Sequence, residues 1–165
     1  MAKLEQFKLH PSVIYSIIRE QAGSPEKALA ELVMNSIDAG AQNIHLDLTA
    51  EKFCIKDDGL GFKSLDEIEM FFGKFGTPHV SNDSAYGQFR LGRGQCFSLS
   101  KTEWRSGQFG MSVDLACVGK TETHGYQLHE FADHVQGCVI SGEFYESLHI
   151  FDRTQSPFVF DRMIQ

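Results

Sequence analysis

Three polar side chains stand at helical spacing inside a segment that is otherwise largely apolar. In the stretch ELVMNSIDAGA, residues 31–41, Glu31, Asn35 and Asp38 are separated by four and three residues. That spacing places all three side chains on one face of an α-helix. Because burying such groups without partners is costly, the pattern predicts that they line a wet cleft or hold a ligand.

Two further stretches carry residues that could serve the same site. In DDGLGF, residues 57–62, Asp57 ends a predicted strand, and Gly59 and Gly61 permit a sharp turn and the close approach of a ligand. In YGQFRLGRGQCFSLS, residues 86–100, glycines precede a predicted helix, whose exposed amides and positive end would attract an anion. Each stretch alone is weakly specific, since Asp-Gly turns and Gly-rich helix starts are common.

The first of these motifs requires a helix to hold it. Ser24 offers an N-cap and Pro25 a first helical residue, so a helix is expected to run from there to about Ala39, with Gly40 at its C-terminal stop. An earlier stretch, residues 11–20, also has the apolar spacing of a short helix.

The remaining elements predict a sheet with helices packed on it. Alternating residues in 43–49 and 52–56 indicate a hairpin, and SLDE at 64–67 is a capping box that opens a helix through Phe72. Residues 73–94 read as a long loop and 95–101 as a helix. The later β-like runs are 102–106, 109–118, 125–132 and 137–145. This order predicts an α+β two-layer sandwich, with helices on one face of a mostly antiparallel mixed sheet.

Composition narrows the classes of protein. The 165 residues fit a single domain, and a net charge of −7 argues against direct nucleic-acid binding by this domain. No apolar run approaches the ~20 residues that span a bilayer, and the start lacks an apolar signal region, so we expect no membrane association and a cytoplasmic location. The four cysteines are scattered, which favours thiols over a zinc site.

Together and in this order, the three motifs resemble those of the GHKL ATPases. This superfamily includes gyrase-type topoisomerases, ninety-kilodalton heat-shock chaperones, sensor histidine kinases and MutL mismatch-repair proteins. ELVMNSIDAGA resembles the first motif of the superfamily, DDGLG the second and GRGQ the Gly-rich third. The resemblance is closest to the MutL-like and histidine-kinase-like ATPase domains. It covers roughly residues 28–100 and implies the histidine-kinase-like ATPase fold, also called the Bergerat fold.

The resemblance implies a role for each motif residue, with ATP and Mg²⁺ as cofactors. Glu31 would be the general base that deprotonates the attacking water, and Asn35 would give an oxygen to Mg²⁺. Asp57 would accept a hydrogen bond from the adenine amino group. Gly59 and Gly61 would let the backbone lie along the base.

Other positions would complete the ATP site. Asp38 would support the helix or the turn near Gly59, and Phe62 lies next to that turn. The third motif would wrap the β- and γ-phosphates as a lid, through Gly92, Arg93, Gly94 and Gln95. Two departures from the family pattern concern neighbouring contacts. His79 stands where many relatives have a lysine, and Gly137-Cys138 where many have Gly-Thr, so Cys138 would be a poorer hydrogen-bond donor there.

These roles imply Mg-ATP binding with slow hydrolysis, and an ATP-driven lid closure that acts as a conformational or dimerisation switch. A protein partner or a second copy of the chain would respond to it. Two alternatives remain open: an ATP-binding protein kinase module, and a non-hydrolysing nucleotide-binding module. MutL-like and chaperone relatives complete the site with a basic residue from a following domain, so a chain ending at Gln165 would be either a small stand-alone member or an N-terminal piece.

Overall fold

The computed structural model describes residues 12–20, 23–72, 92–117 and 125–148. Four helices and four strands follow one another along the chain, with a short 3-10 helix before the last strand. Their bounds are α1 Ser12–Glu20, α2 Pro25–Asp38, β1 Ile44–Leu48, β2 Lys52–Asp57, α3 Leu65–Phe72, α4 Gly92–Leu99, β3 Ser100–Val113, η1 Leu115–Cys117 and β4 Gln127–Phe144. The order of helices, hairpin and late strands is the one that the sequence predicts.

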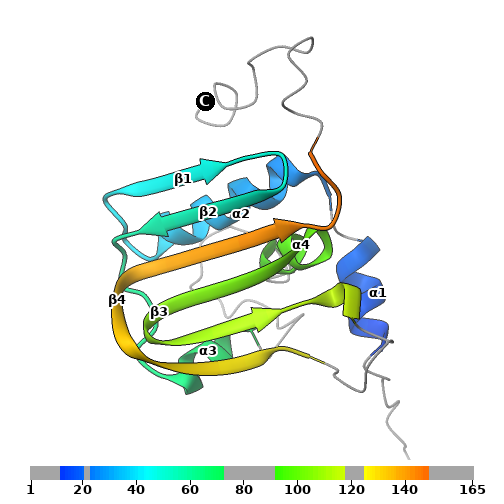
Figure 1. Cartoon of the computed structure of the whole chain (residues 1–165). Helices are drawn as coiled ribbons and strands as arrows, with labels where there is room; N and C mark the ends of the chain where they lie inside the picture. The colour runs from blue at the N-terminus through cyan, green and yellow to red at the C-terminus, as the bar shows by residue number, and fades with distance from the viewer. Residues whose placement is uncertain (1–11, 21–22, 73–91, 118–124, 149–165) are drawn as a thin grey trace, which may run out of the picture.

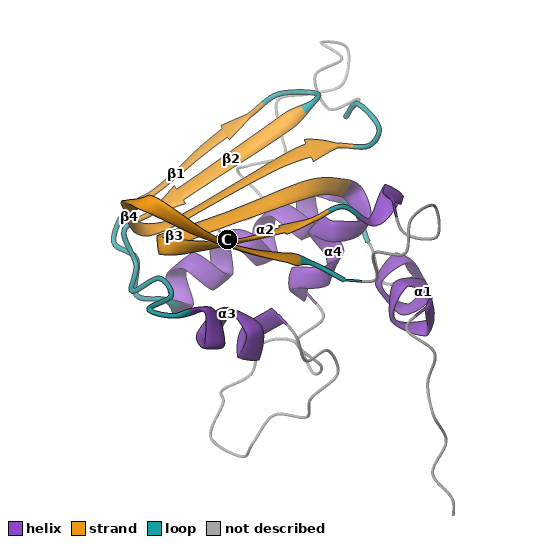
Figure 2. Cartoon of the chain, turned by 60° about the horizontal axis from the view of Figure 1, so that its bottom comes forward, coloured by secondary structure: helices purple, strands orange, loops and turns teal. Residues whose placement is uncertain are grey.

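All strands belong to one antiparallel sheet, in the order β1-β2-β4-β3. The helices lie on one face of this sheet, which confirms the predicted α+β two-layer sandwich (Figures 1 and 2). The opposite face has no helix on it in the described parts of the chain. β1 and β2 form the expected hairpin, in which Ile44 pairs with Asp57 and Leu48 with Phe53.

β3 and β4 are long strands that each double back near the middle, so that β4 wraps around the two halves of β3 (Figure 1). The bend in β3 is at Gly107, whose φ of +59° suits glycine best, and the register with β4 shifts on both sides of it. The bend in β4 ends at Gly137, which has a φ of +68°. The bend in β3 thus separates the expected β-like run 102–106 from the one that begins at Phe109.

Two helix starts confirm the predicted caps. The Ser24 hydroxyl accepts from Lys27 N at 3.3 Å, directly before Pro25, the first residue of α2. The Ser64 hydroxyl accepts from Glu67 N at 3.2 Å before α3. The second half of this capping box differs from expectation, because the Glu67 carboxylate accepts from Lys63 N at 2.8 Å, one residue before the cap.

The core fills the space between the helices and the sheet. Leu32 of α2 and Ile55 of β2 are fully buried, and Phe72 of α3 packs edge-on against Trp104 of β3 with ring centroids 4.7 Å apart. Ile37 of α2 lies outside this core and is 49% exposed.

The end of β4 is fastened on two sides. The Tyr145 hydroxyl donates to Asp114 Oδ1 at 3.1 Å and accepts from Leu115 N at 2.9 Å, which ties it to η1. On the other side, Phe144 N donates to Glu51 O and Leu148 N to Ala50 O, both in the turn between β1 and β2.

Candidate functional site

A cavity of about 270 Å³ lies where α2, the end of β2 and the middle of the sheet meet. Its walls combine apolar side chains with a few polar groups, as small-molecule sites do. The predicted site residues that line it are Asn35, Asp38, Asp57, Gly61, Phe62 and Cys138. Five of them lie between residues 35 and 62 and the sixth is Cys138, so the fold brings together positions that are far apart in the chain.

The Asp57 carboxylate is the most strongly oriented polar group of this cavity. Asp57 is only 8% exposed. Its Oδ1 accepts from Gly59 N at 3.0 Å and from Cys138 N at 3.2 Å, and its Oδ2 accepts from the Ser36 hydroxyl at 2.7 Å. Three donors from a turn, a strand and a helix therefore fix the direction of this side chain before any ligand arrives.

The neighbouring Asp58 has a different task. Its Oδ1 accepts from Gln42 N at 2.8 Å and from Asn43 N at 2.9 Å, and its Oδ2 from the Asn43 side chain at 2.7 Å. These hydrogen bonds lower the pKa of the Asp58 carboxyl, with the Asn43 side chain as the largest cause. Asp58 thus holds the loop before β1 against the turn. The side chain of Asp38 is exposed and lines the cavity.

The two glycines of the turn are required by close contacts. A Cβ on Gly59 would lie 3.0 Å from the carbonyl oxygen of Ala39, at the end of α2. Gly61 has a φ of +61°, and a Cβ there would overlap the Ser106 hydroxyl. The turn therefore lies directly against backbone on both sides.

Glu31 and Asn35 lie one turn apart on α2, and both are half-buried. Asn35 lines the cavity and Glu31 does not. The Asn35 Nδ2 atom is buried and has no hydrogen-bond partner in the described parts of the chain. A buried amide nitrogen without a partner is rare, which marks this side chain as one that a ligand could complete.

The Gly-rich motif forms the start of α4, which packs against α2. The helix begins at Gly92, and Gly94 and Gln95 are buried in its first turn. Gln95 is 8% exposed, and its Oε1 finds no partner among the residues that the structure describes. The side chain of Arg93 lies outside the described residues, as do His79 and segment 73–91, which is most of the predicted long loop.

Cys138 lies opposite Asp57 in the register of β4 and β2. Burial, together with the nearby Asp57 carboxylate, raises the pKa of its thiol to about 12. The thiol therefore stays protonated at neutral pH, and the contact with Asp57 comes from the Cys138 backbone amide.

Comparison with known proteins places this arrangement in a family. A family model described as histidine kinase-, DNA gyrase B-, and HSP90-like ATPase matches residues 23–125, which is more than half of the chain. The chain belongs to this family of GHKL ATPases. The matched span contains all three polar motifs and ends before β4.

The other comparisons do not extend this family assignment. No curated protein matches the chain. One similar solved structure is titled "Crystal Structure of N terminal domain of a DNA repair protein", with 18% sequence identity and a TM-score of 0.47. The match covers 77% of this chain and 40% of that one, so this GHKL chain spans less than half the length of the solved protein. No helix in its described parts combines the length and apolar character that crossing a membrane requires.

Three further residues at the candidate site make contacts that the sequence does not indicate. Ser36 holds the Asp57 carboxylate, and Ser106 contacts the turn at Gly61. Trp104, the single tryptophan, lines the cavity, and its Nε1 is buried without a partner in the described chain. Ser36 lies in α2, and Ser106 and Trp104 lie in β3. No spacing rule links these three positions to the residues they contact, so only the folded arrangement reveals these contacts.

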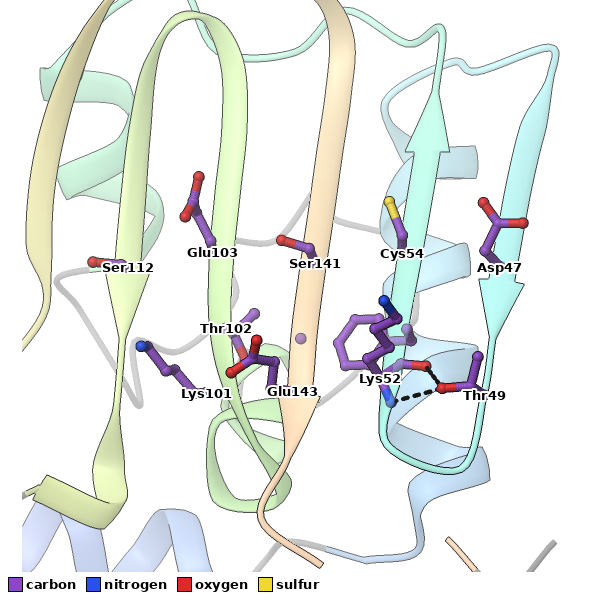
Figure 3. A pocket seen from close by; sticks show the side chains of 12 residues that line it. Asp47, Thr49, Lys52, Cys54, Lys101, Thr102, Glu103, Ser112, Ser141 and Glu143 are labelled. Carbon is purple, nitrogen blue, oxygen red and sulfur yellow. Dashed lines mark hydrogen bonds between the residues drawn. The ribbon is translucent and has the colours of Figure 1, made fainter. Parts of the chain in front are cut away.

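A second and larger hollow of about 490 Å³ lies elsewhere, on the strands of the sheet (Figure 3). Lys52, Glu143 and Lys101 are register neighbours across β2, β4 and β3 there, and Asp47 and Glu103 lie in the next row. This mixed-charge surface contains none of the predicted site residues. The smaller cavity, where oriented polar groups converge, is therefore the candidate functional site.

Proposed function

We propose that the chain binds Mg-ATP in the 270 Å³ cavity and that Asp57 selects adenine. The observation that supports this proposal is an acceptor position on the Asp57 carboxylate that no described group uses. Oδ1 already accepts two hydrogen bonds, whereas Oδ2 accepts one, from Ser36. Because each carboxylate oxygen has about two acceptor positions, Oδ2 keeps one for a ligand N–H group. The 6-amino group of adenine supplies such a donor, while guanine and hypoxanthine present an oxygen at that position.

The size of the cavity supports a base rather than a whole nucleotide. Small-molecule pockets usually measure about 300–1,000 Å³, so this one lies just below that range. The sugar and phosphates would extend from it toward the start of α4. The free amides and positive end of a helix stabilise an anion there, and Gly92, Arg93 and Gly94 belong to this start.

Phosphates and water would mainly hold the magnesium ion of this proposed complex. Among the described residues, no group of three or more His, Cys, Asp or Glu side chains is arranged to bind a metal ion. Mg²⁺ usually keeps several waters and takes few oxygens from protein. The amide of Asn35 would supply one such oxygen, and the bound ion would neutralise phosphate charge.

Slow hydrolysis and a switch form the second part of the proposal. Glu31 would act as general base for the attacking water, one helical turn before Asn35. Closure of residues 73–94 over the phosphates would change the surface that meets a protein partner or a second copy of the chain. This part rests on family membership, because residues 73–91 lie outside the described chain.

Titration of Trp104 fluorescence tests the binding proposal, since this single tryptophan lines the cavity. ATP should bind more tightly than GTP or ITP, and EDTA should weaken ATP binding. Asp57→Asn should lower ATP affinity by about 10- to 100-fold, since hydrogen bonds to charged groups are the stronger ones. Asp58→Asn is the matched control, because that side chain contacts only the loop before β1 in the described structure, and its ATP affinity should stay near wild type. Equal affinity for ATP and ITP in the wild-type protein would reject the adenine assignment.

The enzymatic alternatives need a separate assay. With ³²P-labelled ATP, release of inorganic phosphate supports an ATPase, and label on a protein supports a kinase module. Binding with neither product supports a nucleotide-binding module that does not hydrolyse ATP.

A further inference from the structure

Three backbone segments meet at one buried hydroxyl beside the cavity. Ser106 lies in β3 directly before the bend at Gly107 and is 2% exposed. Its Oγ accepts from Phe62 N at 2.7 Å and donates to the carbonyl oxygen of Gly137 at 2.6 Å. One hydroxyl thus joins the turn after β2 to the bend of β4.

The same place has no room for side chains. A Cβ on Gly61 would overlap the Ser106 hydroxyl and lie 2.6 Å from the Gly137 carbonyl oxygen. A Cβ on Gly137 would overlap the carbonyl oxygen of Asp57. Both glycines have positive φ. Because they lack a Cβ atom, the turn and the bend can pack closely against each other. The Ser106 hydroxyl is the side-chain group that occupies the gap between them.

Both segments joined by Ser106 carry walls of the cavity. Phe62 follows Gly61 on one side, and Cys138 follows Gly137 on the other. Cys138 N is also one of the three donors that orient Asp57. The distance between turn and bend therefore sets both the width of the cavity and the direction of the Asp57 carboxylate.

We propose that Ser106 is a positioning residue for adenine recognition, a role that rests on the proposed function above. The site requires a donor and an acceptor in one small group, since it must satisfy a half-buried N–H and a buried C=O together. Removal of the hydroxyl leaves both unpaired, and turn and bend then shift or admit water. The removal should therefore weaken the binding of the adenine base rather than the binding of the phosphates.

Ser106→Ala and Ser100→Ala form the matched pair that tests this role. Ser100 is the first residue of β3, is fully buried, and its hydroxyl donates to Cys96 O at 2.9 Å. Both variants lose a buried hydroxyl from the same strand. We expect Ser106→Ala to lose about tenfold in ATP affinity. Its ITP affinity should change little, so the ATP-to-ITP ratio falls, whereas Ser100→Ala should keep the wild-type ratio.

Rescue by a conservative variant separates positioning from general damage. Ser106→Thr keeps the hydroxyl and should restore the ATP-to-ITP ratio, even where its added methyl lowers the melting temperature. All titrations are made by Trp104 fluorescence well below the melting temperature of each variant. If Ser106→Ala does not fold, Ser106→Cys takes its place, because a thiol is only a weak donor and acceptor.

Each outcome decides the proposal. An unchanged ATP-to-ITP ratio in Ser106→Ala or Ser106→Cys overturns it, as does an equal fall of the ratio in Ser100→Ala. An ATP-to-ITP affinity ratio near one in the wild-type protein rejects the adenine site itself. The wild-type ratio is therefore measured before any variant.

Discussion

The hydroxyl of Ser36 lies 2.7 Å from Oδ2 of Asp57, so a side chain of α2 donates a hydrogen bond to the carboxylate at the end of β2. Ser36 directly follows Asn35 in the chain. One turn of α2 therefore carries both the proposed metal ligand and the group that orients the proposed adenine acceptor. This contact joins the first polar motif to the second.

Ser36→Ala should weaken ATP binding moderately. The carboxylate loses one of three donors, while Gly59 N and Cys138 N still hold Oδ1, so a loss of about 3- to 10-fold is expected. Ser98→Ala serves as control, because that hydroxyl bonds to Gln95 O within α4. Calorimetry with ATP measures both variants. A Ser36→Ala protein that binds ATP as wild type does would show that Oδ1 alone fixes the carboxylate.

Glu31→Ala should bind Mg-ATP nearly as well as wild type and fail to hydrolyse it. Glu31 does not line the cavity, so ground-state binding should survive its removal. Loss of a general base typically costs about 10²- to 10⁴-fold in rate. Single-turnover hydrolysis is the measurement, with Glu26→Ala on the first turn of the same helix as control. Wild-type turnover by Glu31→Ala would mean that another group activates the water.

Gly137→Ala should destabilise the fold more than Gly40→Ala. Both residues have positive φ, +68° and +75°, so both substitutions cost about 1–2 kcal/mol in backbone conformation. A Cβ at Gly40 meets nothing within 4 Å, whereas one at Gly137 overlaps the Asp57 carbonyl oxygen. This overlap should add about 1–3 kcal/mol. Urea denaturation measures the difference in the free energy of unfolding between the two variants. Equal midpoints would mean that the bend of β4 accommodates the added methyl group without loss of stability.

Cys138 should resist alkylation in the folded protein. Burial and the Asp57 carboxylate raise the pKa of its thiol to about 12, and only the thiolate reacts. At pH 8.5, which is well below that value, iodoacetamide should modify the half-buried Cys54 first. Mass spectrometry of timed samples measures the order, and a sample in urea should show both cysteines reacting. Equal rates in the folded protein would contradict the burial of Cys138.

Periodic and capped elements could be predicted from the sequence, because their signals are local. Ser24 and Pro25 mark the start of α2, and alternation over Ile44, Leu46 and Leu48 gives β1 its face. The motif residues Asn35, Asp57 and Gly61 were also predictable as one site, although from family resemblance rather than from spacing. Whether they bind ATP stays a prediction.

Contacts between distant single residues could not be predicted. Ser106 lies 44 residues from Phe62 and 31 from Gly137, and no pattern in the chain links these positions. The doubling back of β3 has a local cause in Gly107, but a strand that bends and one that ends look alike in sequence. The hydrogen bonds of Asp58 to the loop at Asn43 have the same origin, since nothing in the sequence links residue 58 to residues 42 and 43.

The attachment of Tyr145 has a mechanical consequence. Tension applied to the chain beyond Leu148 would first load the hydrogen bonds at Tyr145 and at the turn between β1 and β2. These bonds divide the pull between the two sides of the sheet, one through η1 and the other through the β1–β2 hairpin. Cys138 and the bend of β4 lie upstream of both anchors, so a force transmitted along the chain from its C-terminal end would load these anchors before it reached Cys138.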